Sequence, residues 1–289
     1  MDYAHPDYLI APAELEPRLQ EPRLRVLDAT VFLVPAAAGY TAESGREEYD
    51  KGHIPGSAFM DLIQSFSDTT TGLGFSLPTP PAVADALGRL GISHHDDVIL
   101  YSSGHMMWAT RALWLLRYAG HERVAVLDGG LHRWRAEGRA LSTQAHSYPA
   151  TTYLPDPRPE LFVDLSGMLE AVASGSVCTV NALSPEVYAG TGDRHYGRRG
   201  HIPGSLNVHY DELMENGNFR AAADLEAALA SRGVLEAEQV VIYCGGGISA
   251  TIDAFACLLL GKNDVAVYDG SMSEWVGDES LPLTIGEAP

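Results

Sequence analysis

Cys244 stands between a strand-forming segment and a run of three glycines. Residues 240–243 are β-branched or aromatic, which predicts a short buried strand. Residues 250–260 form an apolar run typical of a packed helix, and Gly261 is expected to end it. A thiol at this junction faces a helix amino terminus and a bowl of backbone N–H groups. Both features stabilise a thiolate, so the pattern predicts a nucleophilic cysteine.

An internal repeat indicates how these elements are positioned. Three sequence anchors occur twice and in the same order: 52–57 with 200–205, 98–101 with 240–243, and 126–129 with 267–270. Each copy alternates short apolar strands with helices, which is typical of a mostly parallel sheet covered by helices on both faces. The chain is therefore predicted to be a duplicated α/β domain.

The two copies are separated by a segment rich in proline. Residues 141–160 carry four prolines among serines and threonines, which is typical of a linker. The first domain is therefore placed at residues 1–140 and the second at residues 161–289.

The copies differ where chemistry is expected. Ser102 in the first copy takes the place that Cys244 has in the second. A serine hydroxyl is far less acidic than a thiol and has no adjacent base in the sequence, so the first loop is predicted to be catalytically silent. Met107 and Trp108, which follow that loop, are expected to form a wall of the neighbouring site.

Bulk composition narrows the classes of partner. The 289 residues carry 19 Lys+Arg against 38 Asp+Glu, a net charge of −19, which argues against nucleic acid and anionic membranes. No apolar run approaches the length of a membrane span, and residues 1–6 have no signal-peptide pattern. Three widely spaced cysteines do not indicate a disulfide framework, so a cytoplasmic location is expected.

These motifs together resemble the tandem-domain rhodanese-type sulfurtransferases, which use thiosulfate or 3-mercaptopyruvate. The resemblance covers nearly the whole chain: the paired His-Ile-Pro-Gly turns, the loop 244–249, the stretch 260–271 and the inactive first domain. It implies a two-step reaction in which Cys244 takes a sulfur atom from a small donor and holds it as a persulfide. The persulfide then passes the sulfur to cyanide or a thiol, such as a thioredoxin-like protein.

The loop residues fit that chemistry on their own terms. A persulfide anion needs hydrogen-bond donors rather than a metal, so no metal or organic cofactor is implied. The expected donors are the backbone N–H groups of five residues: Gly245, Gly246, Gly247, Ile248 and Ser249. The Ser249 hydroxyl is also expected to cap the following helix.

The choice of donor stays open at this point. Thiosulfate-type relatives commonly carry cations directly after the cysteine, and mercaptopyruvate-type relatives carry Gly-Ser-Gly. The Gly-Gly-Gly loop is nearer to the second type, although Gly246 lacks the hydroxyl proposed there for proton transfer. One of the two arginines of that type aligns with Val187 and is missing, while Arg194 aligns near the other. Arg194 is therefore the first candidate for binding the donor anion, with Arg198 and Arg199 behind it.

The resemblance also raises His53 as a site residue at the domain interface. The duplicate His201 instead favours a structural role for both histidines in their turns.

Three other classes of function fit part of the sequence pattern. Gly245, Gly247 and Ala250 formally fit a dinucleotide-binding fingerprint, but too little chain follows to complete that sheet. A cysteine phosphatase would need an arginine to close the loop, which has Ile248, Ser249 and Ala250 instead. A persulfide carrier that does not turn over small donors remains the non-enzymatic alternative.

Overall fold

The computed structural model describes residues 2–35 and 40–289. The first half of the chain contains β1 Leu9–Ile10, α1 Pro12–Leu15, β2 Leu24–Asp28, β3 Val31–Pro35, β4 Tyr40–Ser44, α2 Arg46–Lys51, β5 Ala58–Phe59, α3 Pro80–Arg89, β6 Asp97–Tyr101, α4 Met107–Tyr118, β7 Val124–Leu127 and α5 Gly130–Ala136. The second half contains β8 Phe162–Val163, α6 Leu165–Ser174, β9 Cys178–Asn181, α7 Pro185–Tyr188, β10 Leu206–Asn207, β11 Met214–Glu215, β12 Asn218–Phe219, α8 Ala222–Ala230, β13 Val240–Tyr243, α9 Ala250–Leu259, β14 Val265–Tyr268 and α10 Ser271–Trp275. Short 3₁₀ turns cover Pro6–Tyr8, Glu16–Arg18, Pro159–Leu161 and Tyr210–Leu213.

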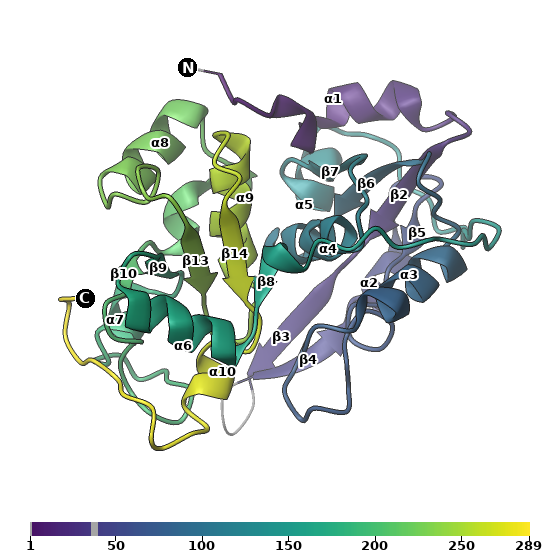
Figure 1. The fold of residues 1–289 in the computed structure, drawn as a ribbon. Coiled ribbons are helices and arrows are strands. Elements are labelled where there is room, and N and C mark those ends of the chain that lie inside the picture. The colour runs from purple at the N-terminus through teal and green to yellow at the C-terminus, as the bar shows by residue number, and fades with distance from the viewer. Residues whose placement is uncertain (1, 36–39) are drawn as a thin grey trace.

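Each half of the chain forms an α/β domain with its own parallel sheet (Figure 1). The strand order is β5-β2-β6-β7-β1 in the first domain and β10-β9-β13-β14-β8 in the second. All neighbouring strands in both sheets are parallel. Since the two orders correspond strand for strand, the predicted duplication of an α/β domain is confirmed.

The central strands were predictable from sequence and the edge strands were not. Strand β13 coincides with the strand predicted at residues 240–243, the repeat of that segment at 98–101 lies in β6, and α9 ends just before Gly261, whose φ is +85°. The edge strands β1 and β8 were missed. Each is two residues long and pairs with β7 or β14, which is too short for any alternation of side chains to show.

The duplicated His-Ile-Pro-Gly-Ser turn is tied to the strand that leads into each loop. The hydroxyl of Ser57 lies 2.9 Å from that of Tyr101 at the end of β6. Ser205 and Tyr243 repeat this contact at 2.7 Å at the end of β13. Each turn therefore fixes the last residue before its loop.

The two domains meet through helices α4 and α9. Every residue of α9 is buried, and its Thr251 hydroxyl lies 2.7 Å from the hydroxyl of Thr110 on α4. The amino-terminal segment also crosses between the domains, because the amide of Ala4 donates to the carbonyl of Leu259 at 2.8 Å. Among the described residues, no helix combines the length and apolar character needed to cross a bilayer.

The proposed linker follows the surface of the first domain. Between residues 141 and 158 the chain forms no helix and only an isolated bridge at Ser142. Its backbone is held by the first domain, since the amide of Thr151 donates to the Gly88 carbonyl and that of Arg158 to the Tyr118 carbonyl, both at 2.9 Å.

Asp28 and Asn181 occupy equivalent positions at the ends of β2 and β9. Asp28 Oδ1 accepts from the amide of Thr30 at 2.9 Å, and Asn181 Oδ1 accepts from the amide of Leu183 at 2.8 Å. Both side chains are fully buried. Burial raises the pKa of Asp28 from its ordinary 3.8 to about 6, against the hydrogen bonds from Thr30 that lower it.

This burial predicts a pH-dependent stability that Asp28→Asn removes. A raised folded-state pKa gives full stability below pH 3.8, and this contribution is lost as the pH rises through about 6. The loss is about 3 kcal/mol for a shift of this size. Urea unfolding at several pH values should therefore show Asp28→Asn gaining stability over wild type between pH 4 and pH 7. Asp224→Asn, exposed on α8, is the matched control, and parallel curves for wild type and Asp28→Asn would contradict the expectation.

Candidate active site

Cys244 lies directly after β13 and its side chain is covered. The residue is 2 % exposed. Its amide and that of Gly247 both donate to the hydroxyl oxygen of Ser271 at 3.0 Å. The same hydroxyl donates to the Tyr268 carbonyl at 2.7 Å. One buried serine therefore holds both ends of the tight turn that begins at the cysteine.

Ser271 was missed by the sequence analysis, although the repeat carries the signal for it. Its φ is +50°, and the equivalent residue of the first domain is Gly130 with a φ of +51°. A left-handed conformation costs a residue other than glycine about 1 kcal/mol or more. The three hydrogen bonds of the Ser271 hydroxyl offset that cost. A comparison of Asp-Gly-Gly in the first copy with Asp-Gly-Ser in the second would have singled it out.

The amides of the loop are only partly free. Within residues 2–35 and 40–289, the amides of Gly245, Gly246, Ile248 and Ser249 donate to no other group. The expectation that the Gly247 amide is also available is wrong, because it donates to Ser271. The expected cap is wrong as well: in the described part of the chain the Ser249 hydroxyl makes no bond to the first turn of α9. Four donors therefore remain for an anion.

The three glycines of the loop are present for different reasons. Gly247 has a φ of +71°, and a Cβ there would lie 2.5 Å from the Asp269 carbonyl oxygen. A Cβ on Gly245 would lie 2.1 Å from the hydroxyl oxygen of Tyr196. A Cβ on Gly246 would meet nothing closer than 3.9 Å. Backbone therefore excludes a side chain at Gly247, the Tyr196 ring must move to admit one at Gly245, and Gly246 has open space.

Arg111 on α4 holds the loop from the first domain. Its side chain is 1 % exposed and donates to the Gly247 carbonyl at 3.2 Å and to the Phe75 carbonyl at 2.7 Å. It also forms an ion pair with Asp269 at 2.7 Å. The second carboxylate oxygen of Asp269 accepts from the amide of Leu77 at 2.7 Å. Two first-domain segments therefore converge on the turn that carries Cys244.

The aspartate of the repeated Asp-Gly motif reaches into the other domain in both copies. Asp128 accepts from the amide of Phe219 at 3.0 Å, as Asp269 accepts from that of Leu77. Arg133 pairs with Asp128 at 2.7 Å. This motif was recognised in the sequence as a repeat, but its role between domains was not.

Two tyrosines lie near Cys244, and an arginine and a third tyrosine lie beside them. Tyr196 is 41% exposed, yet desolvation of its hydroxyl raises its pKa, and negative charge on the nearby Cys244 raises it further. Burial, then Asp211 and Cys244, raise the pKa of Tyr210. The Arg194 guanidinium lies 5.1 Å from the centre of the Tyr40 ring and lowers the pKa of both other tyrosines. The sequence analysis found Arg194 but missed all three tyrosines.

The candidate arginines separate into two groups. Arg198 donates to the carbonyls of Asp278 and Leu281 at 3.0 and 2.9 Å, and Arg199 donates to the Gly190 carbonyl at 3.4 Å. These two hold backbone. Arg194 instead lies along Tyr40 on β4, whose hairpin with β3 extends from the first domain toward the second (Figure 1).

His53 is placed in its turn and not in the loop. Its Nδ1 lies 2.8 Å from the Tyr49 carbonyl, its Nε2 lies 3.1 Å from the Gln144 carbonyl, and its ring stacks on Tyr49. His201 repeats the arrangement with Tyr188 at 2.8 Å. The shared geometry favours a structural role for His53, so we leave it out of the proposed site.

Met107 and Trp108 lie at the start of α4 with different surroundings. Trp108 is 1 % exposed and packs against Phe75, with 5.0 Å between ring centres. Met107 is half-buried, and its carbonyl accepts from the Thr251 hydroxyl at 3.4 Å. Trp108 therefore packs within the first domain, and Met107 contacts the second domain through Thr251. That both residues form a wall of the site stays a prediction.

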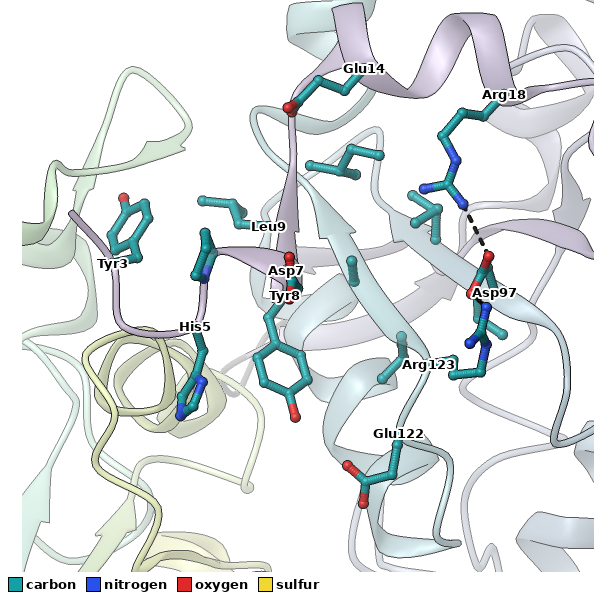
Figure 2. A pocket seen from close by; sticks show the side chains of 16 residues that line it. Tyr3, His5, Asp7, Tyr8, Leu9, Glu14, Arg18, Asp97, Glu122 and Arg123 are labelled. Carbon is teal, nitrogen blue, oxygen red and sulfur yellow. Dashed lines mark hydrogen bonds and ion pairs between the residues drawn. The ribbon is translucent and has the colours of Figure 1, made fainter.

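Two cavities in the structure lie away from the nucleophile. A cavity of about 850 Å³ is found at the amino ends of β6 and β7, beside the ion pair of Arg18 and Asp97 (Figure 2). Another, of about 810 Å³, separates the first-domain loop 103–106 from the β11–β12 hairpin. No residue of the loop 244–249 lines either cavity.

Comparison with known proteins identifies the family. A family model for the rhodanese-like domain matches residues 11–137 and 183–278, one region in each domain. The chain belongs to the rhodanese family. The 3-mercaptopyruvate sulfurtransferase of Escherichia coli K12 is 32% identical over 271 residues, covering 93% of this chain and 95% of the relative. The structure of SseA from Escherichia coli superposes with a TM-score of 0.82 at 30% identity, covering 91% of this chain and 98% of that one.

Two further relatives carry different names. A thiosulfate sulfurtransferase of Corynebacterium glutamicum is 32% identical and covers 99% of this chain and 93% of the relative. The sulfur carrier protein TtuD of Thermus thermophilus is 31% identical and covers 99% of this chain and all of the relative. Similarity to this rhodanese therefore extends to proteins named for either donor and to one named as a carrier.

Two glycines of the loop are expected to differ in how much their substitution lowers the stability of the protein. Gly247→Ala should lower the free energy of unfolding by about 2 kcal/mol, because its φ is positive and its Cβ would meet backbone. Gly246→Ser should fold like wild type, because the space around it is open. Urea unfolding of both variants measures the difference, and equal losses of stability would contradict it.

The Arg111 ion pair predicts that the first rhodanese domain stabilises the loop of the second. Arg111→Ala leaves a buried carboxylate without its partner and should cost about 3 to 5 kcal/mol of stability. Arg111→Lys keeps the charge but loses the forked contacts to Gly247 and Phe75. We expect the lysine variant to be clearly more stable than the alanine variant. We also expect it to be slower than wild type, either in alkylation of Cys244 by iodoacetamide or in turnover. Wild-type stability of Arg111→Ala would contradict this role.

Proposed function

We propose that this chain is a sulfurtransferase that moves a sulfane sulfur from a small anionic donor, through a Cys244 persulfide, to a thiophilic acceptor. The observation that carries the proposal is the cysteine at the start of a loop with four amides free of other partners in the described chain. A persulfide anion at that position is stabilised by such donors. Cyanide and small or protein thiols, including a thioredoxin-like one, are suitable acceptors.

The reaction has two steps at one sulfur. The Cys244 thiolate attacks the transferable sulfur of the donor, an S–S bond forms, and the bond between that sulfur and the rest of the donor breaks. The acceptor then attacks the outer sulfur and releases the thiolate. Arg194, held against Tyr40, supplies the positive charge that attracts the donor anion.

We favour 3-mercaptopyruvate slightly over thiosulfate as the donor. The residues after Cys244 are glycines and carry no cation, whereas a doubly charged thiosulfate is better served by positive side chains there. Thiosulfate remains the alternative, since Arg194 and the free amides suit either anion. The relative named as a sulfur carrier supports a second candidate, a persulfide carrier that delivers sulfur to a protein partner.

Steady-state sulfur transfer to cyanide tests the proposal directly. Wild type should turn over at least one of the two donors, and Cys244→Ser should lose about 10³-fold or more in kcat/KM with either. Cys178→Ser is the matched control, because Cys178 begins β9 and pairs with Val240 at the far end of β13 from the loop. Turnover that survives in Cys244→Ser would contradict the role of the cysteine. If neither donor is turned over while Cys244 still alkylates rapidly, the carrier candidate is favoured.

A further inference from the structure

The phenol of Tyr196 lies against the backbone directly after the nucleophile. A Cβ placed on Gly245 would be 2.1 Å from the Tyr196 hydroxyl oxygen and 2.2 Å from its Cζ. Such distances mean that the end of this ring fills the space that a side chain on Gly245 would take. A side chain on the residue after the cysteine would therefore displace the Tyr196 ring, although no unusual φ is needed there.

The Tyr196 hydroxyl is free to donate. In the described part of the chain it makes no hydrogen bond with another residue. Although 41% of the Tyr196 surface is exposed, desolvation of its hydroxyl raises its pKa, and negative charge on the nearby Cys244 acts in the same direction, so the group keeps its proton at neutral pH. A neutral phenol beside a reacting anion is a hydrogen-bond donor and a proton donor.

The backbone that carries Tyr196 is anchored on its carboxyl-terminal side. Arg198, two residues later, donates to the carbonyls of Asp278 and Leu281. The amide of Gly197 donates to Nδ1 of His195 at 3.1 Å. These contacts place the ring over the loop, and the Arg194 charge lies on the same segment.

We infer that Tyr196 is the proton donor for the carbon leaving group when 3-mercaptopyruvate gives up its sulfur, an inference that rests on the function proposed above. Gly246 provides no hydroxyl at the centre of the loop, and the space around it is open. Tyr196 instead brings a hydroxyl to the loop beside Gly245, from a different segment.

The step balances with the protons that the donor brings. Cys244 thiolate attacks the thiol sulfur of 3-mercaptopyruvate, the S–S bond forms, and the C–S bond breaks with its electron pair on carbon. The two sulfurs are oxidised to the persulfide level and the carbon is reduced to the enolate of pyruvate. Tyr196 donates its proton to this enolate, giving pyruvate, and its phenolate regains a proton from the S–H of the new persulfide. The products are the persulfide anion and pyruvate.

Sulfur transfer from thiosulfate requires no proton donor for the leaving group. The thiolate attacks its outer sulfur, the S–S bond of the donor breaks, and sulfite leaves with the electron pair and no proton. A phenol that donates a proton therefore affects the two donors differently, whereas a phenol that merely supports the loop affects both alike.

Tyr196→Phe tests this difference. We expect kcat/KM with 3-mercaptopyruvate to fall about 10²-fold, which is typical of losing a general acid, and the ratio of 3-mercaptopyruvate to thiosulfate activity to fall with it. Tyr210→Phe is the matched control, because this tyrosine also lies near Cys244 but packs edge-on against His105 and His209. It should leave the ratio within about threefold of wild type.

A second variant keeps the test decisive. Adding Gly246→Ser to Tyr196→Phe places a hydroxyl in the open space of the loop and should restore at least part of the 3-mercaptopyruvate activity. Equal losses with both donors in Tyr196→Phe, or a wild-type ratio, would overturn the inference. Failure of the proposed function would give a different result from failure of this inference, because the wild-type protein would then turn over neither donor.

Discussion

The buried ion pair between Arg111 and Asp269 connects the two domains at the point where the chemistry is placed. Its guanidinium belongs to the first domain, while its carboxylate and the Gly247 carbonyl belong to the turns around Cys244. Removing a buried guanidinium and a mostly buried carboxylate from water is costly, and this cost is offset here by four polar contacts of 2.7 to 3.2 Å. The reactive loop therefore takes its shape from both domains.

The same scaffold occurs twice, but one copy has the features of a reactive loop. The sheets match strand for strand, the histidine turns match, and each Asp-Gly aspartate accepts an amide from the opposite domain. The copies differ at Cys244 and Ser102 and at Ser271 and Gly130. The Ser271 hydroxyl fixes two amides of the loop, those of Cys244 and Gly247. The cysteine and the serine that holds its turn therefore occur in the same copy.

Much of the fold could be predicted, because duplication makes weak local patterns visible twice. The central strands β6 and β13 and helix α9 followed from apolar runs, and Cys244 is the candidate nucleophile because it precedes three glycines. The edge strands could not be predicted, since two residues carry no pattern. Within the candidate site, Cys244 was predicted from its local sequence motif, and Arg194 was predicted from the family resemblance. Tyr40, Tyr196 and Tyr210 were not, because distant segments bring them to the loop and nothing in their own neighbourhoods marks them.

Gly246 shows how specificity can vary without a change of fold. On one side of it Gly245 lies against the Tyr196 ring, and on the other Gly247 has a positive φ, yet Gly246 itself has no positive φ and open space around it. A single substitution at this position therefore changes the chemistry offered to a donor while the packing beneath stays intact. Mutational freedom in this loop is concentrated at one residue, and it lies two positions from the nucleophile.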